Sequence, residues 1–244
     1  MKLQHTAEKL MVALDYPSAE DARLLIDRLQ GIPCYIKVGM QLYYTAGPDF
    51  VRELKAKGYK VFLDLKMHDI PNTVKGGANS ITRLGVDMFN VHAAGGVTMM
   101  TAAREGADEA LAKDASLTSP LIIAVTQLTS TDQRTLNEEI GILGTVEEAV
   151  VRYAKRTFQA GLDGVVASPL EVEAIKMACG PDFRTVTPGI RPAGSAVGDQ
   201  SRIMTPAEAI RCGTDFIVVG RPITASPDPR RAAEQILEEM TTSC

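Results

Sequence analysis

The sequence of 244 residues contains no tryptophan, only three histidines and only four cysteines. The cysteines lie far apart and form no Cys-x-x-Cys pair, which argues against a structural zinc site and against a disulfide framework; they are Cys34, Cys179, Cys212 and Cys244. No stretch approaches the ~18 consecutive apolar residues of a membrane span, and the first residues lack the apolar core of a signal peptide. We therefore expect reduced thiols, no bound metal, no membrane association and a cytoplasmic location.

Positive charge is not in excess either. The chain has 26 basic and 30 acidic residues, a formal net charge of −4, so it lacks the general footprint of a nucleic-acid-binding protein. An anionic ligand would need a local cluster of positive groups. The proportions of hydrophobic residues, 45%, and charged residues, 23%, are those of a folded globular protein, and the length permits one large core.

Short apolar runs rich in β-branched residues recur along the chain, and most are followed by a polar turn and a helix-like spacing of apolar residues. The expected strands are 10–14, 34–38, 60–65, 87–91, 120–125, 164–167, 183–186 and 215–219. The expected helices are 18–30, 48–57, 71–84, 96–112, 145–160, 169–178 and 228–240.

Eight strands that alternate with helices imply a parallel sheet, because each right-handed crossover carries the chain back to the same end. An open doubly wound sheet is the alternative, but it would leave two edges to protect. We predict an α/β fold of the (β/α)8 (TIM) barrel type, in which residues 1–244 form a single domain.

Charged residues gather where the first three expected strands end, which is the functional face of such barrels. Asp15 follows the first strand, Lys37 lies near the end of the second, and Asp64 and Lys66 end the third. Two residues apart on a strand, Asp64 and Lys66 face the same way. A structural ion pair would account for them alone, but an alternating Asp–Lys array that keeps every group charged indicates a catalytic site.

The stretch from Val61 to Val74 reads VFLDLKMHDIPNTV and closely resembles the signature of the orotidine 5′-monophosphate decarboxylase family. Its Asp-x-Lys-x-x-Asp core is shared with related barrels that handle phosphosugars, whereas the Asp-Ile-Pro-Asn-Thr extension is more specific. Further blocks that resemble the family follow along the chain without departure at the motif positions; they are 14–15, 36–39, 125–130, 187–192 and 219–223.

The resemblance implies loss of carbon dioxide from C6 of orotidine 5′-monophosphate, giving uridine 5′-monophosphate in de novo pyrimidine biosynthesis. Many decarboxylases borrow an electron sink from a cofactor, but the sequence has no dinucleotide fingerprint, no Walker loop and no cluster of metal ligands. We expect no cofactor. A fixed lysine can stabilise the developing negative charge and then donate a proton. By the resemblance this proton donor is Lys66, flanked by Asp64 and Asp69, and Lys37 completes the network.

The phosphate of such a nucleotide needs a positive pocket in this acidic chain. Gly220 and Arg221 follow the eighth expected strand, where barrels of this kind commonly bind phosphate. The glycine lets the backbone approach and the arginine grips phosphate oxygens, although a surface arginine beside a turn glycine is the alternative. The resemblance adds Arg191 as a second phosphate ligand.

Residues 188–204 form a long stretch containing glycine, serine and proline, and loops of that length inside compact domains are usually functional. We expect a lid over the phosphate, with Gln200 bridging phosphate and base. Thr126, after the fifth strand, is the candidate for hydrogen bonding to the pyrimidine. The predicted substrate contacts are Asp15, Lys37, Asp64, Lys66, Asp69, Ile70, Thr73, Thr126, Pro188, Arg191, Gln200, Gly220 and Arg221.

The resemblance also implies a homodimer in which Asp69 and Thr73 reach into the neighbour's site, whereas the sequence alone leaves Asp69 open as a plain helix cap before Pro71. Two other functions stay open. One is a magnesium-dependent phosphosugar decarboxylase or aldolase-type enzyme built on the same core, and the other is a nucleotide-binding regulatory barrel without turnover. For His92, after the fourth strand, we favour a structural role.

Overall fold

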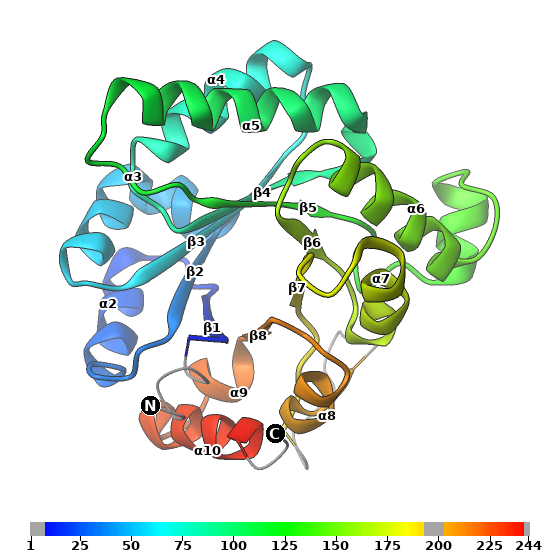
Figure 1. The fold of residues 1–244 in the computed structure, drawn as a ribbon. Coiled ribbons are helices and arrows are strands. Elements are labelled where there is room, and N and C mark those ends of the chain that lie inside the picture. The colour runs from blue at the N-terminus through cyan, green and yellow to red at the C-terminus, as the bar shows by residue number, and fades with distance from the viewer. Residues whose placement is uncertain (1–7, 193–202, 242–244) are drawn as a thin grey trace.

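The structure, a computed structural model, describes residues 8–192 and 203–241. Its eight strands pair in parallel, each with its neighbours along the chain, and form one closed barrel. β1 also pairs with β8, with Leu10 opposite Ile217. Figure 1 shows the strands in the middle of the molecule and the helices around them. The strands are β1 (Leu10–Leu14), β2 (Tyr35–Gly39), β3 (Lys60–Met67), β4 (Met88–His92), β5 (Leu121–Val125), β6 (Gly164–Val166), β7 (Arg184–Thr187) and β8 (Phe216–Val219).

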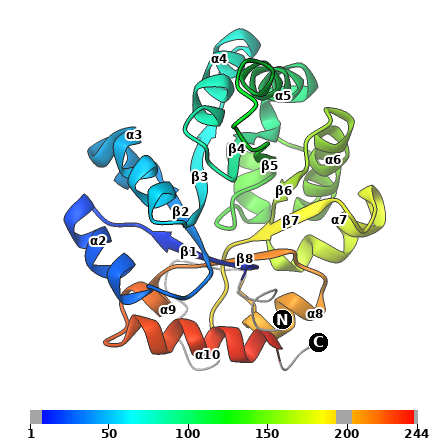
Figure 2. The same cartoon turned by 60° about the vertical axis from the view of Figure 1, so that its left-hand side comes forward.

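The prediction of a (β/α)8 barrel is confirmed, and the open doubly wound sheet is excluded, because the pairing of β1 with β8 closes the ring. Helices connect the strands and cover the outside of the barrel in both views (Figures 1 and 2). The α-helices are α2 (Ala19–Arg28), α3 (Met40–Ala56), α4 (Pro71–Thr82), α5 (Gly96–Lys113), α6 (Val146–Gln159), α7 (Val172–Cys179), α8 (Pro206–Arg211), α9 (Arg221–Thr224) and α10 (Pro229–Thr241). None of the helices in the described ranges is long and apolar enough to span a membrane.

Three α-helices differ from the sequence prediction. The helix expected at 48–57 begins at Met40, because α3 is two helical pieces joined at a kink where Gly47 has φ of 66° and Pro48 follows. Glycine accepts the positive φ, and proline can start the second piece because its missing N–H needs no partner there. The sequence prediction recognised only that second piece.

The second difference is α8, which falls where no helix was predicted. Thr205 caps it by accepting from the backbone N–H of Glu208, and the Glu208 carboxylate bonds back to Thr205 in a capping box. This Thr-Pro-Ala-Glu sequence is a recognisable helix start. The third difference is the short helix α9, which was not predicted either. The other added elements are the 3-10 turn η1 (Ala93–Gly95) and the π-helix η2 (Thr135–Glu139), whereas the helix predicted at 169–178 begins as the 3-10 turn η3 (Pro169–Glu171).

The barrel interior is divided along its axis into an apolar part and a charged part. A cluster of inward-facing side chains fills its apolar part: Met11, Ala13, Tyr35, Phe62, Met88, Ile123, Val186 and Val218. Because alternate residues of a strand share a face, the next inward positions after Tyr35 and Phe62 are Lys37 and Asp64. Polar side chains therefore enter the interior only near the carboxyl ends of these strands, above an apolar floor.

Candidate active site

A cavity of about 670 Å³ opens at the carboxyl ends of the strands. Its floor is apolar and includes Phe62, Val186 and Val218. Polar residues from several strand ends and the loops after them form its wall; they are Asp15, Lys37, Asp64, Lys66, Gln127, Thr129, Ser130, Arg191 and Arg221. The structure thus brings together most of the residues that the sequence placed in the site.

The centre of the cavity holds an alternating chain of charges. Lys37 Nζ lies 3.2 Å from Asp15 Oδ1 and 3.2 Å from Asp64 Oδ2. Lys66 Nζ lies 2.7 Å from Asp64 Oδ1. β1, β2 and β3 are adjacent in the barrel, so residues at their ends meet although they are far apart in sequence. The alternating Asp–Lys array predicted from the residues at the strand ends is therefore present in the structure.

Burial and charge act in opposite directions on the two inner members of this array. Burial disfavours the charge of Lys37, but attraction to Asp64 and Asp15 outweighs it and raises the pKa of the lysine. Burial likewise opposes ionisation of Asp64, but Lys37 and Lys66 outweigh it and lower the pKa of the carboxyl. Both groups are therefore charged at neutral pH, as opposite neighbours require.

The backbone at Lys66 has an unusual conformation. Lys66 has φ of 53°, and in the described part of the chain it is the one residue other than glycine with a positive φ. Its backbone N–H donates to Asn90 Oδ1 at 2.8 Å, and Asn90 Nδ2 donates to Asp64 Oδ1 at 2.7 Å. Asn90 was not predicted as a functional residue, because it lies in the middle of β4 among apolar residues.

Two arginines lie on the side of the cavity formed by the ends of β7 and β8. Arg191 is buried, its Nη1 donating to the Ile190 carbonyl at 2.9 Å, and Arg221 begins α9 directly after Gly220. Pro188 and Gly189 line the cavity between them. The expected phosphate-binding groups therefore lie together. Gln200 and most of the predicted lid, 193–202, lie outside the described residues.

Thr126 is placed differently from the prediction. It is buried, its hydroxyl donates to the Val166 carbonyl at 2.9 Å, and it is not among the residues that line the cavity in the described chain. Its successors Gln127, Thr129 and Ser130 line the cavity instead. They belong to the block 125–130 that resembles the family. The sequence did not predict which residues of this block face the cavity, because that depends on the conformation of the loop.

Asp69, Ile70 and Thr73 are also absent from the described residues that line the cavity. All three are exposed, and Asp69 Oδ1 accepts from the Ile70 backbone N–H at 2.6 Å. The helix α4 begins at Pro71, as the sequence suggested, with Ile70 rather than Asp69 in the capping position. A single chain therefore does not bring Asp69 to Lys66.

Two histidines lie beside the site. The rings of His68 and His92 are 5.6 Å apart, and burial, together with His68 and Lys66, lowers the pKa of His92. We find no group of three or more His, Cys, Asp or Glu side chains arranged to hold a metal ion within 8–192 and 203–241.

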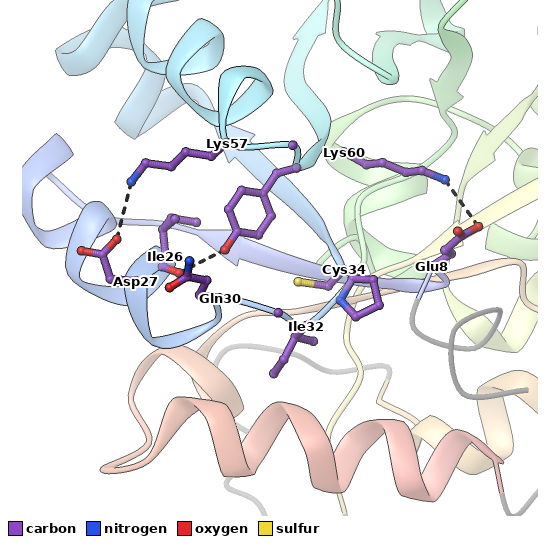
Figure 3. Close-up of a pocket in the computed structure, with 12 residues that line it drawn as sticks. Glu8, Ile26, Asp27, Gln30, Ile32, Cys34, Lys57 and Lys60 are labelled. Carbon is purple, nitrogen blue, oxygen red and sulfur yellow. Dashed lines mark hydrogen bonds and ion pairs between the residues drawn. The ribbon is translucent and has the colours of Figure 1, made fainter. Parts of the chain in front are cut away.

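A second pocket, of about 520 Å³, lies at the opposite end of the barrel, beside the start of β2 and β3 (Figure 3). Its charged side chains pair with one another, Lys57 with Asp27 at 3.5 Å and Lys60 with Glu8 at 3.4 Å. Burial raises the pKa of the Cys34 thiol to about 12, so it is not a ready nucleophile. The cavity at the carboxyl ends is the better candidate site.

Comparison with known proteins agrees with this geometry. The sequence profile of the orotidine 5′-phosphate decarboxylase / HUMPS family matches residues 8–236. The chain belongs to this family. The resemblance drawn from residues 61–74 is therefore confirmed.

Relatives in the orotidine 5′-phosphate decarboxylase / HUMPS family match almost the whole chain. An orotidine 5′-phosphate decarboxylase of Moorella thermoacetica is 53% identical over 97% of this chain and 93% of its own length. One from Streptococcus pneumoniae is 54% identical over 95% and 96% of the two chains. The crystal structure of the enzyme of that name from Lactobacillus acidophilus has a TM-score of 0.85 at 42% identity, covering 96% of this chain and 99% of that one.

Proposed function

We propose that this chain decarboxylates orotidine 5′-monophosphate to uridine 5′-monophosphate and carbon dioxide, a step of de novo pyrimidine biosynthesis. The observation that carries the proposal is the Asp15–Lys37–Asp64–Lys66 array at the mouth of the barrel. Relatives of that name cover nearly the whole chain, which supports it. The reaction class is that of a carboxy-lyase.

Lys66 is the proposed proton donor. When the bond between C6 and the carboxylate breaks, the electron pair remains on C6, and a nearby ammonium stabilises that charge before donating its proton. Asp64 accepts a hydrogen bond from Lys66 Nζ at 2.7 Å, so it fixes the direction of the lysine side chain. Lys37 forms an ion pair with the second oxygen of Asp64.

The remaining contacts divide between the two ends of the nucleotide. Arg191 and Arg221 are proposed to bind the phosphate, with the backbone at Pro188 and Gly220 allowing close approach. Gln127, Thr129 and Ser130 offer hydrogen-bonding groups toward the base and are added to Thr126 as candidates. The role of Gln200 as a bridge between phosphate and base stays a prediction.

We further propose that the active form is a cytoplasmic homodimer of single-domain chains, in which Asp69 and Thr73 complete the partner's site. The exposure of Asp69 on one chain supports this, because a carboxylate that reaches no group of its own site is available to another. Ile70 beside it is an apolar side chain that is 67% exposed, as expected of a surface that a second chain covers.

The test follows the absorbance of orotidine 5′-monophosphate with the purified chain, with and without a metal chelator. We expect one uridine 5′-monophosphate and one carbon dioxide per substrate, at the same rate in both samples. Lys66→Ala should reduce turnover by more than about 10³-fold while nucleotide binding stays measurable.

Three results would contradict the proposal. Near-normal turnover by Lys66→Ala would remove Lys66 as proton donor. Magnesium-dependent turnover of a phosphosugar in place of the nucleotide would favour the phosphosugar branch of the family, and tight nucleotide binding without turnover would favour a regulatory barrel.

A further inference from the structure

The register between β3 and β4 breaks at the site. Phe62 and Leu63 lie opposite Met88 and Phe89, and the pairing resumes only with Met67 opposite Val91. Residues 64–66 of β3 therefore lie opposite a single residue of β4, Asn90. Such a bulge re-aims side chains and leaves ladder groups without their usual partners.

The side chain of Asn90 supplies those partners. It is 1% exposed, and its two polar atoms bond across the bulge, Oδ1 to the Lys66 backbone N–H and Nδ2 to Asp64 Oδ1. The partners fix the orientation of the amide, since an N–H can only donate and an ionised carboxylate can only accept. Asparagine is a neutral side chain of the right length to offer one acceptor to Lys66 and one donor to Asp64.

The hydrogen bond from the Lys66 backbone N–H to Asn90 holds Lys66 in an unfavourable backbone conformation. A positive φ is unfavourable for a residue with a Cβ, and such conformations persist where surrounding groups hold them. At Lys66 the positive φ turns the chain at the end of β3 and so determines where the ammonium lies. Asn90 is placed to hold the backbone of Lys66 and the carboxylate that orients its Nζ at the same time.

We propose that Asn90 is a positioning residue for the decarboxylation: it holds the strained backbone of Lys66 and the carboxylate of Asp64 in one arrangement, so that the ammonium points at the reacting carbon. This rests on the proposed function, in which Lys66 is the proton donor. Asn90 itself is not among the described residues that line the cavity, so it acts through its two partners rather than on the substrate.

The first test is Asn90→Ala, with Asn79→Ala as the matched control. Asn79 is half-buried, whereas Asn90 is buried, and it too uses its side-chain amide, which donates to the backbone carbonyl of Gly106 at 3.0 Å. It lies in α4 away from the cavity. Asn90→Ala should lower kcat by about 10²-fold, because displacing a reacting group by about 1 Å has an effect of that size. Its affinity for uridine 5′-monophosphate should stay within about threefold of wild type, because Asn90 is not among the described residues that line the cavity. Asn79→Ala should leave both values unchanged.

The second test, Asn90→Asp, is specific to the amide's two hydrogen bonds. The introduced carboxyl can accept from Lys66 and donate to Asp64 only while it is protonated. Once ionised it faces the Asp64 carboxylate, so burial and like charge raise its pKa. The kcat of this variant should therefore be near wild type in acid and fall as the pH rises, whereas the profile of Asn90→Ala should not show this step. The other titratable groups near this point, Lys37, His68 and His92, are the same in every variant.

A crystal structure of Asn90→Ala provides a measurement that does not depend on activity. We expect Lys66 to leave the positive-φ region. The positioning role is refuted if Lys66 keeps its φ and kcat stays near wild type, or if Asn90→Asp shows no pH-dependent recovery. Failure of the proposed function is a separate result, since the wild-type chain would then not decarboxylate the nucleotide, while the φ of Lys66 in Asn90→Ala would still decide whether Asn90 holds it.

Discussion

The carboxylate of Asp64 joins three side chains at the site. One oxygen accepts from Lys66 and Asn90, and the other lies 3.2 Å from Lys37. A buried carboxylate is stable in its ionised form only when its oxygens are paired in this way. Because the same contacts orient Lys66, the stability of this region and the proposed chemistry depend on one residue.

Replacing Asp64 by asparagine should therefore destabilise the fold at neutral pH. The change leaves Lys37 buried beside a neutral group, and removing one member of a buried pair lowers the free energy of unfolding by about 3 kcal/mol. Asp49→Asn is the matched control, because Asp49 pairs with Arg52 at the surface and its replacement should change little. Urea denaturation of the three proteins at pH 7 checks this.

The pH dependence of that difference has a defined sign. The pKa of Asp64 is lowered in the folded chain, so its stabilising contribution is fully present above the unfolded value, about 3.9, and is lost as the pH falls through the folded value. The wild type and Asp64→Asn should thus differ by a constant amount from pH 5 to pH 8 and converge in stronger acid. Convergence already near neutral pH would show that Asp64 is not held as an ionised group.

At the scale of secondary-structure elements, three aspartates each join two neighbouring strands at the end of the barrel opposite the site. Asp87, Asp163 and Asp215 stand just before β4, β6 and β8, and each accepts the backbone N–H of a residue in the preceding strand, at 2.7, 2.6 and 2.8 Å. Each also pairs with a lysine or arginine of a neighbouring element: Lys55, Arg104, Lys176 and Arg184. Before β2 the corresponding residue is Cys34, which lines the pocket of Figure 3. These hydrogen bonds and ion pairs stabilise this end of the barrel, as expected of the amino-terminal face.

The outer layer contains one very close helix contact, between α4 and α5, which lie side by side in both views (Figures 1 and 2). A Cβ added at Gly106 of α5 would overlap the carbonyl group of Lys75 in α4. Gly106→Ala, which in an open helix would stabilise the protein, should instead lower the free energy of unfolding by about 1–3 kcal/mol.

The matched control for Gly106→Ala is Gly76→Ala in α4. No atom lies within 4 Å of a Cβ added at Gly76, so the usual gain of up to about 1 kcal/mol is expected there. Thermal or urea unfolding of both variants measures whether each substitution raises or lowers the free energy of unfolding. Stabilisation by Gly106→Ala would mean that the helices separate easily.

At the scale of the whole molecule, the strand order was predictable because strands such as β1 and β2 are buried on both faces and form short apolar runs. The site followed from the strand ends, since Asp15, Lys37, Asp64 and Lys66 are hydrophilic residues directly after or within such runs. Arg221 could be placed by the same reasoning, whereas Arg191 was expected only from the family resemblance.

Other features depended on three-dimensional contacts that periodicity does not encode. Asn90 stands in a buried strand like many structural polar residues, and only the bulge of β3 explains it. The orientation of Thr126 away from the cavity depends on a hydrogen bond to β6. The placement of Asp69 outside its own chain's cavity depends on where α4 begins. The early start of α3 was hidden by Gly47 and Pro48.

The central claim is that Lys66 at the barrel mouth performs the chemistry in a site that Asp69 of a second chain completes. Mixing inactive Lys66→Ala with inactive Asp69→Ala, and allowing subunits to exchange, tests both parts in one assay. Random pairing makes about half of the dimers hybrids, each with one intact site out of two, so about one quarter of wild-type turnover of orotidine 5′-monophosphate should return. No recovery after demonstrated subunit exchange would contradict the account.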